Sequence, residues 1–597
     1  MPEDHQTRVV FDRENPLISI WMERLALPST RVMPVSPQPE HLSAPLSIVE
    51  PDGTVSTGVE ALFVLMHRNC LRSWPLWLYR RAGVLATSGE WLFRRVTERP
   101  ELILRVASLL HGPFTGRPSY FLTRRVFLGG LGIIYCIAFL SLSQQITGLI
   151  GEQGILPVDQ FLSAVHQQFG PAGWVLFPSV FWIDHGDLFL RIICYIGIAC
   201  SITLVIGITP RLVAMMLWAC YLSVYMVGQD FLAFQWDILL LEAGFLGMLL
   251  APFTMKTEHE RAPRMLLLVK LLLFRLMFQS GIVKLTSGDR SWSDLTALTY
   301  HFHTQCIPTP VAWYAQHLPV RVLQTMTAIM FVVEIAVPFL IFAPRRVRMI
   351  AGSIMIGLQV IIALTGNYTF FNYLTIVLCL VLFDDRTYRR VLPPRMKERR
   401  ASDILFPPRT GQVQSAVIVV AVLLNTIHLA GLVVEPRTMP GIMRDAVRWS
   451  SHYGIMNSYG LFRVMTKTRP EIIVEGSNDG EHWREYEFRY KPGDTLRSPP
   501  WVAPHQPRLD WQMWFAALGD YRDNRWFLNF MVRLLQGSPP VLRLIGTNPF
   551  PDHPPRFVRA LLYDYRFTGA EHRAMTGEVW ERTYLGIYMP PIRLTGE

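Results

Sequence analysis

The sequence is poor in charged residues for its length. Only 17% of its 597 residues are Asp, Glu, Lys or Arg, whereas half are hydrophobic. Soluble globular chains carry roughly 25% charged residues, so this deficit indicates membrane-spanning segments. A disordered chain would need the opposite composition, which excludes disorder as the main state.

Cysteine is also scarce. None of the seven cysteines belongs to a Cys-x-x-Cys pair, and none follows Cys379. These absences argue against a disulfide-stapled ectodomain, a zinc ribbon and a Cys-x-x-Cys oxidoreductase. The polar residues 1–5 are followed by no apolar run, so we expect no secretory signal peptide.

Long apolar runs are abundant. A helix needs about 20 residues to cross a bilayer, and nine runs approach that length. The eighth run is the weakest and could be re-entrant. The nine predicted spans lie at about 126–146, 188–208, 212–227, 236–252, 265–285, 322–343, 349–365, 371–383 and 415–434.

The charges between these runs alternate. Residues 147–187 contain no Lys or Arg, whereas residues 384–414 contain eight. Because Lys and Arg accumulate in cytoplasmic loops, the alternation predicts nine spans, a cytosolic N-terminus and an outer C-terminal region. Topology then accounts for much of the net charge of +11, so we expect no nucleic-acid partner.

Residues 1–115 are expected to form a small cytosolic α/β domain. Its opening, VVFDRENPLI at 9–18, resembles the start of the DCC thiol-disulfide oxidoreductases, a thioredoxin-like family. Arg13, Asn15 and Ile18 stand where that family has its glycine and both cysteines. Thiol exchange needs a thiolate, so the resemblance implies a thioredoxin-like domain without redox activity.

Several longer motifs follow residue 119. They include SYFLTR at 119–124, GLIGEQGILP at 148–157, GQDF at 228–231, LTGNY at 364–368, NSYGLF at 457–462, RLDWQMWF at 508–515 and NPF at 548–550. With these motifs the chain resembles the lipase maturation factor family over about residues 119–592.

The resemblance implies a multi-pass membrane protein that helps secreted homodimeric lipases to fold and assemble. It implies no catalytic residue and no cofactor. We expect a transmembrane domain at 119–435 and an outer domain at 440–597. Family members in animals reside in the endoplasmic reticulum membrane, but the added N-terminal unit favours a bacterial inner membrane.

Charges inside a membrane are costly and usually paired. Seven charged residues fall inside the predicted spans: Arg191, Asp237, Glu242, Lys270, Arg275, Lys284 and Glu334. By depth, we expect Asp237 to pair with Lys284, and Arg275 to pair with Glu242 or Glu334. Such pairs can simply fasten the helices together. The alternative is a polar cavity that opens outward.

The cavity hypothesis has an enzymatic form. The stretch GIVKL at 281–285 also resembles the membrane family that includes vitamin K-dependent carboxylase, in which a lysine is the proposed base. That resemblance makes Lys284, with Asp237, an alternative catalytic site. We favour the maturation factor. A transporter is disfavoured because the two halves show no inverted repeat.

The outer loop between the fifth and sixth spans holds three histidines, His301, His303 and His317. No thiolate or suitably spaced carboxylate completes a metal site, so we expect no metal.

The C-terminal region predicts a small β-sandwich with a helical insert, an α+β domain. Strands are expected at 471–475, 486–490 and 556–567, and helices within 508–545. The region is rich in aromatic residues, which dominate binding hot spots. The candidates for docking a secreted client are Trp501, Trp511, Trp514 and Phe515. No Gly-x-Ser-x-Gly motif is present, so the protein is not a recognisable lipase.

Overall fold

The computed structural model describes most of the chain after residue 119 and parts of the region before it. The described residues are 8–12, 15, 18, 31–35, 46–50, 54–70, 79, 81, 83–98, 120–252, 262–392, 408–432 and 437–594. The N-terminal residues form one compact unit and the rest of the chain another, so each is described by itself.

The N-terminal unit is built on a four-stranded mixed sheet. Its strands are β1 (Arg8–Asp12), β2 (Arg31–Val35), β3 (Leu46–Val49) and β4 (Val55–Thr57), in the order β2-β1-β3-β4. Strands β1 and β2 run parallel, whereas β3 is antiparallel to both of its neighbours. Helices α2 (Gly58–Cys70) and α4 (Gly83–Glu98) supply Val59, Val64 and Phe93 to the core with Val9 and Ile48.

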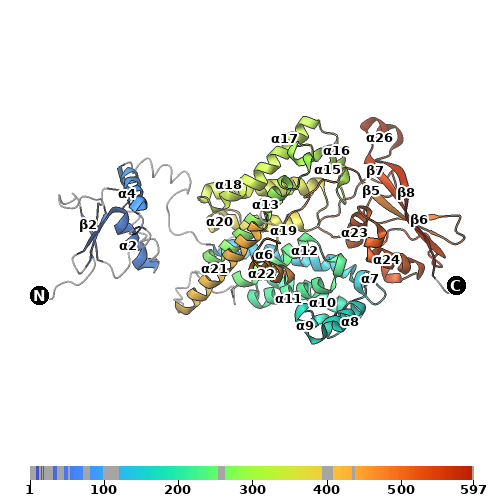
Figure 1. The fold of residues 1–597 in the computed structure, drawn as a ribbon, viewed down its shortest axis with the longest axis horizontal. Coiled ribbons are helices and arrows are strands. Elements are labelled where there is room, and N and C mark those ends of the chain that lie inside the picture. The colour runs from blue at the N-terminus through green and yellow to red at the C-terminus, as the bar shows by residue number, and fades with distance from the viewer. Residues whose placement is uncertain are drawn as a thin grey trace. The chain divides into compact units, whose positions relative to one another are not determined.

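All nine apolar runs are helical in the second unit (Figure 1). They form α6 (Phe121–Ser143), α10 (Asp187–Ile206), α11 (Pro210–Val227), α12 (Gln235–Leu250), α13 (Ala262–Leu285), α17 (Val320–Phe331), α18 (Arg345–Thr365), α19 (Phe371–Cys379) and α21 (Pro408–Ala430). Helix α17 continues through a π-helical turn, η4 (Val332–Ala336), into the 3-10 helix η5 (Val337–Phe342).

Six of these helices are long and apolar enough to cross a membrane. They cover Phe121–Ser143, Asp187–Ile206, Pro210–Val227, Met265–Leu285, Val320–Phe342 and Arg345–Thr365. The other three have shorter apolar stretches: α12 has 16 residues and contains two acids, and the apolar stretches at α19 and α21 are Phe371–Leu382 and Ser415–Ala430. The fold therefore supports a multi-pass membrane protein with six candidate spans among the described residues.

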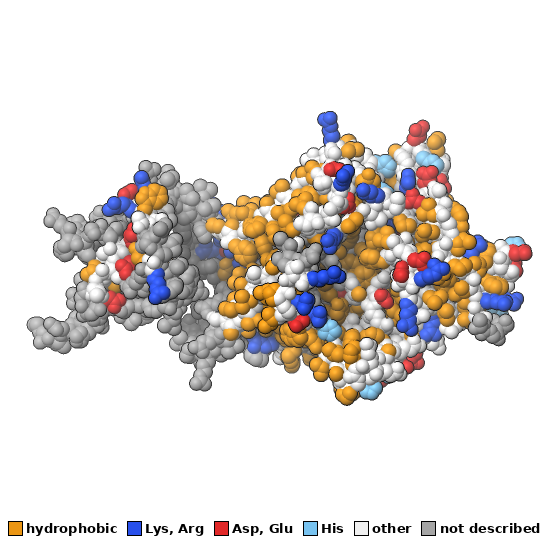
Figure 2. Space-filling view, viewed as in Figure 1, with side chains coloured by type: hydrophobic (Ala, Val, Ile, Leu, Met, Phe, Trp, Pro, Cys, Tyr) orange, Lys and Arg blue, Asp and Glu red, His pale blue; other side chains and the backbone are white. Residues whose placement is uncertain are grey.

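Close helix packing depends on small residues. Helix α6 packs against α10, α12 and α19. A Cβ atom on Gly197 of α10 would lie 2.5 Å from the ring of Phe139 on α6, so only glycine permits this approach. On their other faces, helices such as α10 and α18 expose apolar side chains, which dominate the visible surface of the helical part (Figure 2).

Short helices connect the bundle. They are α7 (Ile146–Ile150), α8 (Val158–Phe169), α9 (Gly173–Leu176), α14 (Arg290–Ser293), α15 (Leu298–Thr304) and α16 (Pro310–Gln316). Of these, α7, α15 and α16 lie on the side of the C-terminal sheet (Figure 1). At the opposite end, Asp385 of α20 (Asp385–Val391) accepts hydrogen bonds from the N–H groups of Phe121 (2.8 Å) and Thr123 (3.0 Å) and so caps α6.

The C-terminal region contains one antiparallel sheet in the order β6-β5-β7-β8. Its strands are β5 (Pro470–Ser477), β6 (Arg484–Tyr486), β7 (Phe557–Phe567) and β8 (Trp580–Ile592). Helices α23 (Arg508–Ala517), α24 (Arg525–Leu535) and α25 (Pro539–Leu542) form the predicted helical insert; α22 (Gly441–His452) and α26 (Ala570–Thr576) complete the region.

The predicted β-sandwich is wrong, since the described residues of this region form no second sheet. Helix α23 packs against β5 and α24 against β7, so helices take the place of the second sheet and the region is α+β.

Candidate functional site

The strongest concentration of buried charge lies where the C-terminal segments enter the helices. Glu242 of α12 forms an ion pair with Arg275 of α13, and each side chain is only 1% exposed. Arg275 is therefore paired with one of the two acids expected for it. Glu242 also accepts hydrogen bonds from the Asn457 N–H (2.9 Å) and the Tyr459 hydroxyl (2.7 Å). The NSYGLF motif thus inserts into the bundle and completes this pair.

Asp237 is satisfied by a residue from the C-terminal helices. Arg508, at the start of α23, donates to both carboxylate oxygens of Asp237 at 2.8 and 3.0 Å. The Tyr221 hydroxyl donates to the same carboxylate at 2.5 Å. Both charged side chains are at most 1% exposed. The expected pairing of Asp237 with Lys284 is therefore wrong. The Arg508 guanidinium, 271 residues further along the chain, binds both carboxylate oxygens of Asp237 through two of its nitrogens, a geometry that lysine cannot provide.

Lys284 pairs instead with Glu334, with its Nζ 2.6 Å from a glutamate oxygen. Glu334 lies in the π-helical turn η4, and the Lys284 ammonium also faces the ring of Trp292 at 5.5 Å. Lys284 and Asp237 are therefore held by different partners, Glu334 and Arg508. No contact joins these two residues in the described part of the chain, so the carboxylase-like alternative is not supported.

A fourth buried cation, Arg469, was missed by the sequence reasoning. Arg469, just before β5, is fully buried and pairs with Glu471 at 2.7 Å. It also donates to the carbonyls of His303 (2.8 Å), Cys306 (2.7 Å) and Gln305. Arg469 therefore fastens the loop after α15 to the sheet. Its only sequence signal is its place just before the strand expected at 471–475.

The glycine-rich loop at 148–154 also belongs to this junction. A Cβ atom on Gly148 would lie 2.4 Å from the Pro540 carbonyl of α25. Arg533 donates to the Gly154 carbonyl at 2.8 Å, and Ser538 donates to the Gln153 carbonyl at 2.7 Å. The motif therefore provides close backbone contact for the C-terminal helices.

The aromatic candidates divide into two buried and two exposed residues. Trp511 is 4% exposed and its ring lies 4.7 Å from that of Trp236. Trp514 is 7% exposed and its indole N–H donates to the Thr304 carbonyl at 3.0 Å. These two residues join the sheet region to the helices and are wrong as docking candidates. Trp501 and Phe515 remain accessible, at 58% and 43%.

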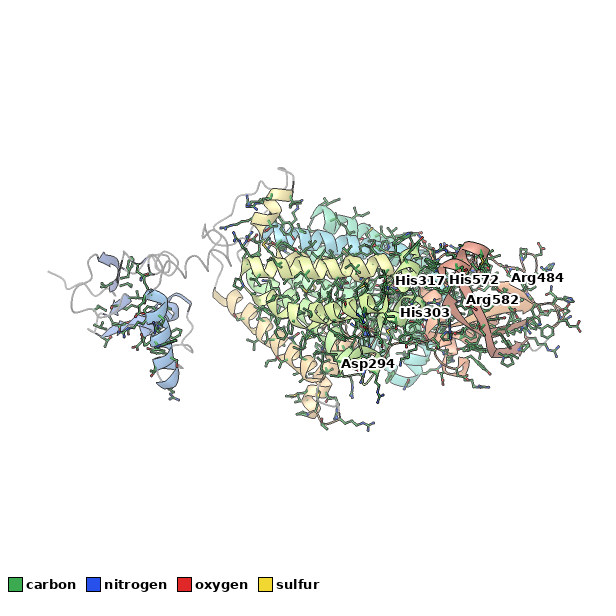
Figure 3. All side chains as sticks on the ribbon, turned by 90° about the horizontal axis from the view of Figure 1, so that it is seen from above. Asp294, His303, His317, Arg484, His572 and Arg582 are labelled. Carbon is green, nitrogen blue, oxygen red and sulfur yellow. The ribbon has the colours of Figure 1, made fainter. Side chains whose placement is uncertain are left out.

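The three loop histidines serve separate contacts. His301 meets the Tyr368 hydroxyl (3.2 Å), His303 the Gln316 amide oxygen (3.2 Å) and His317 the Trp313 carbonyl (2.7 Å). Figure 3 shows His303 and His317 near the sheet end of the helices. Burial and the nearby Lys284 charge lower the pKa of His301 to about 4. Within the described residues no group of three potential ligands is suited to a metal.

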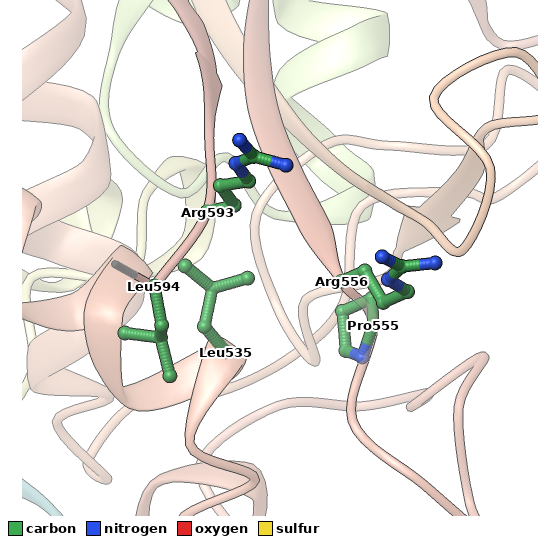
Figure 4. Close-up of a pocket in the computed structure, with 5 residues that line it drawn as sticks. All are labelled: Leu535, Pro555, Arg556, Arg593 and Leu594. Atoms are coloured by element: carbon green, nitrogen blue, oxygen red, sulfur yellow. The ribbon is translucent and has the colours of Figure 1, made fainter. Parts of the chain in front are cut away.

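Two small surface pockets lie on the C-terminal region. One is lined by Leu535, Pro555, Arg556, Arg593 and Leu594, with both arginine side chains at its rim (Figure 4). The other lies between the 490–500 segment, Pro308 and Trp580. The first lining contains no nucleophilic side chain, and the second includes Tyr490, Lys491 and Ser498.

The N-terminal unit has a structural contact where a Cys-x-x-Cys pair would stand. The Asn15 side chain accepts a hydrogen bond from the Ile18 N–H (3.4 Å) and donates to the Thr97 carbonyl (3.1 Å). Ile18 is fully buried in the core. Neither side chain at these two positions carries a thiol.

Comparison with known proteins gives a consistent result for the second unit. Residues 122–390 match the lipase maturation factor transmembrane domain, and residues 455–590 match the lipase maturation factor C-terminal domain. No solved structure matches significantly.

Curated relatives extend the match across both domains. The chain is 36% identical to lipase maturation factor 2 of Homo sapiens, over 79% of this chain and 83% of the relative. It is 35% identical to lipase maturation factor 1 of Mus musculus, over 80% of this chain and 88% of the relative. The chain therefore belongs to the lipase maturation factor family.

Proposed function

We propose that this protein is a multi-pass membrane factor that assists the maturation of secreted lipases. The observation that carries the proposal is the similarity to named lipase maturation factors over 79% of the chain, across both family domains. The structure supports it, because the C-terminal sheet is held against the helices by Arg508 and Arg469. A rigid platform of this kind can hold an incompletely folded client close to the membrane.

Trp501 and Phe515 are our proposed client contacts. Both are large, exposed aromatic residues, and each lies beside well-anchored structure. Next to Trp501, the Val502 N–H donates to the Asn367 side-chain oxygen at 2.8 Å. The centres of the Phe515 and Phe234 rings lie 5.9 Å apart. Exposed aromatics on a rigid support lose little entropy when they bind a partner.

Co-expression with a secreted homodimeric lipase tests this function. We expect the wild-type protein to raise lipase activity per unit of secreted lipase mass, and the Trp501→Ala/Phe515→Ala variant to lose most of this gain. Leu528→Ala is a matched control, because Leu528 is an exposed apolar residue (44%) on α24. If the wild-type protein does not raise the specific activity of the secreted lipase, the proposed function is wrong. If the double variant raises it as much as the wild type does, only the assignment of Trp501 and Phe515 as client contacts is wrong.

We infer that all nine helical segments lie within the membrane, with a cytosolic N-terminus and an outer C-terminal sheet. The loop charges support this topology. The three shorter helices also carry acids or amides that meet partners inside the bundle: Glu242 of α12 with Arg275, Asn372 of α19 with Gln359, and Asn425 of α21 with Arg275.

We also infer that the N-terminal unit is a thioredoxin-like domain without redox activity. Its mixed sheet with a parallel β1–β2 pair supports the fold, and Asn15 and Ile18 support the absence of thiol exchange.

A further inference from the structure

Two cations meet at the end of the bundle where α6 and α13 begin. Lys270 lies on α13, five residues into the candidate span Met265–Leu285, or roughly 8 Å along the helix axis. Arg348 lies in the first turn of α18. Both side chains are half-buried, so each is partly withdrawn from solvent but still accessible.

Tyr120 lies against both cations. The Lys270 Nζ is 6.0 Å from the centre of the Tyr120 ring, and Arg348 contacts the Tyr120 hydroxyl at 3.5 Å. The Arg348 Nε donates to the Leu382 carbonyl at 3.0 Å, which fixes the guanidinium. A neutral ring and a backbone carbonyl hold the cations in place but do not neutralise them.

No carboxylate in the described part of the chain forms an ion pair with either cation. The acids described at this end have other tasks: Asp385 caps α6, and Asp384 accepts from the Thr387 N–H at 3.2 Å. Three other buried cations described above are paired, namely Arg275, Lys284 and Arg508. Charges at membrane depth are costly unless paired, so this site lacks an anion.

We propose that Lys270 and Arg348, with Tyr120, bind the phosphate group of an anionic phospholipid. A headgroup phosphate sits at the depth that both side chains reach, and arginine matches phosphate with two parallel donors. Basic pockets between transmembrane helices bind anionic headgroups by this chemistry. The apolar side chains exposed along α18, including Ile350 and Ile354, provide a surface for the acyl chains.

The test measures lipid retained by the purified full-length protein. The protein is reconstituted in bilayer discs of phosphatidylcholine with phosphatidylglycerol, released into detergent and analysed by native mass spectrometry. We expect phosphatidylglycerol to be retained in preference to phosphatidylcholine, and Lys270→Gln/Arg348→Gln to lose this preference. Each charge near a membrane surface contributes about fivefold, so the double variant should lose about 25-fold.

Arg390→Gln is the matched control, because Arg390 is an exposed arginine on α20 in the basic 384–414 segment. It should retain the lipid as the wild type does, as should the charge-conserving Lys270→Arg. If the double variant accumulates poorly, the single Arg348→Gln variant should show a loss of about fivefold.

Three results would overturn the proposal. The first is equal retention of phosphatidylglycerol by the wild type and the double variant, which would mean that Lys270 merely extends to water. The second is an equal loss in Arg390→Gln, which would indicate general surface charge. The third is displacement of the lipid by millimolar inorganic phosphate, which would assign the site to free phosphate.

Discussion

Lys284 and Glu334 form an ion pair in which both side chains are at most 9% exposed. Replacing Lys284 by Met should leave Glu334 buried without its partner, at a cost of roughly 3–5 kcal/mol. Lys284→Met/Glu334→Leu should recover much of that loss, because no buried charge is then left alone. Thermal unfolding of the purified protein measures both effects.

The exposed pair between Arg448 and Asp445 on α22 is the control for this cycle. Arg448→Gln should change stability by at most about 1 kcal/mol, as is typical of surface pairs. A fully stable Lys284→Met protein that no longer supports lipase maturation would show that Lys284 acts in function rather than in stability.

Two half-buried histidines, His301 and His505, make stability depend on pH. Burial lowers the pKa of His301 to about 4, and burial with the nearby Arg508 and Arg489 charges does the same for His505. The unfolded chain, with ordinary histidine pKa values near 6.5, binds more protons than the folded protein between pH 6.5 and 4. Stability should therefore fall as the pH drops through this window, by roughly 2 kcal/mol per histidine at pH 5.

Melting temperatures at pH 7 and pH 5 test this expectation. His301→Gln/His505→Gln should lose much less stability than the wild type on acidification. His482→Gln is the control, because the His482 side chain is 86% exposed in the β5–β6 turn. An equal acid response of the double variant and the wild type would contradict the assignment.

Helix α23 is the element that joins the sheet to the bundle. Arg508→Met should leave Asp237, which is fully buried, with only the Tyr221 hydroxyl as a partner. We expect the C-terminal helices to loosen and limited proteolysis after residue 500 to accelerate about tenfold or more, since a lost buried partner costs several kcal/mol. Asp237→Asn/Arg508→Met should be cleaved more slowly than the single variant.

Arg522→Gln is the control for the proteolysis, because Arg522 forms an exposed pair with Asp520 in the same region. It should leave the cleavage rate unchanged. Wild-type cleavage rates in Arg508→Met would show that the hydrophobic contacts alone hold α23 in place.

Elements with a strong local pattern were predictable, and those that depend on distant partners were not. The nine helices follow from apolar runs, and β7 from its alternating residues. Strand β8 was missed because its exposed stretch at 583–585 breaks the alternation and Pro590 and Pro591 interrupt the strand pattern. The pairing of Arg508 with Asp237 was missed because the sequence analysis matched charges by their depth within the predicted spans, and Arg508 lies outside those spans.

Over the whole molecule, the loop charges predict opposite sides for the two ends of the membrane region. Reporter fusions after residues 115 and 597 should report opposite compartments, cytosolic and outer. The same compartment for both would mean an even number of spans. In that case the short α19, with nine residues in its α-helical part, is the first segment to reconsider.

The separation of Asp237 from Arg508 along the chain also sets an order of events during synthesis. The acid is made 271 residues before its partner. At about 5–20 residues per second, that interval is roughly 15–55 s. Throughout it, Asp237 of α12 has only the Tyr221 hydroxyl as a partner, whereas Glu242 gains Arg275 only 33 residues later. During its own synthesis the protein therefore passes through a stage in which its membrane region is incompletely folded, with a buried acid that still lacks its ion-pair partner.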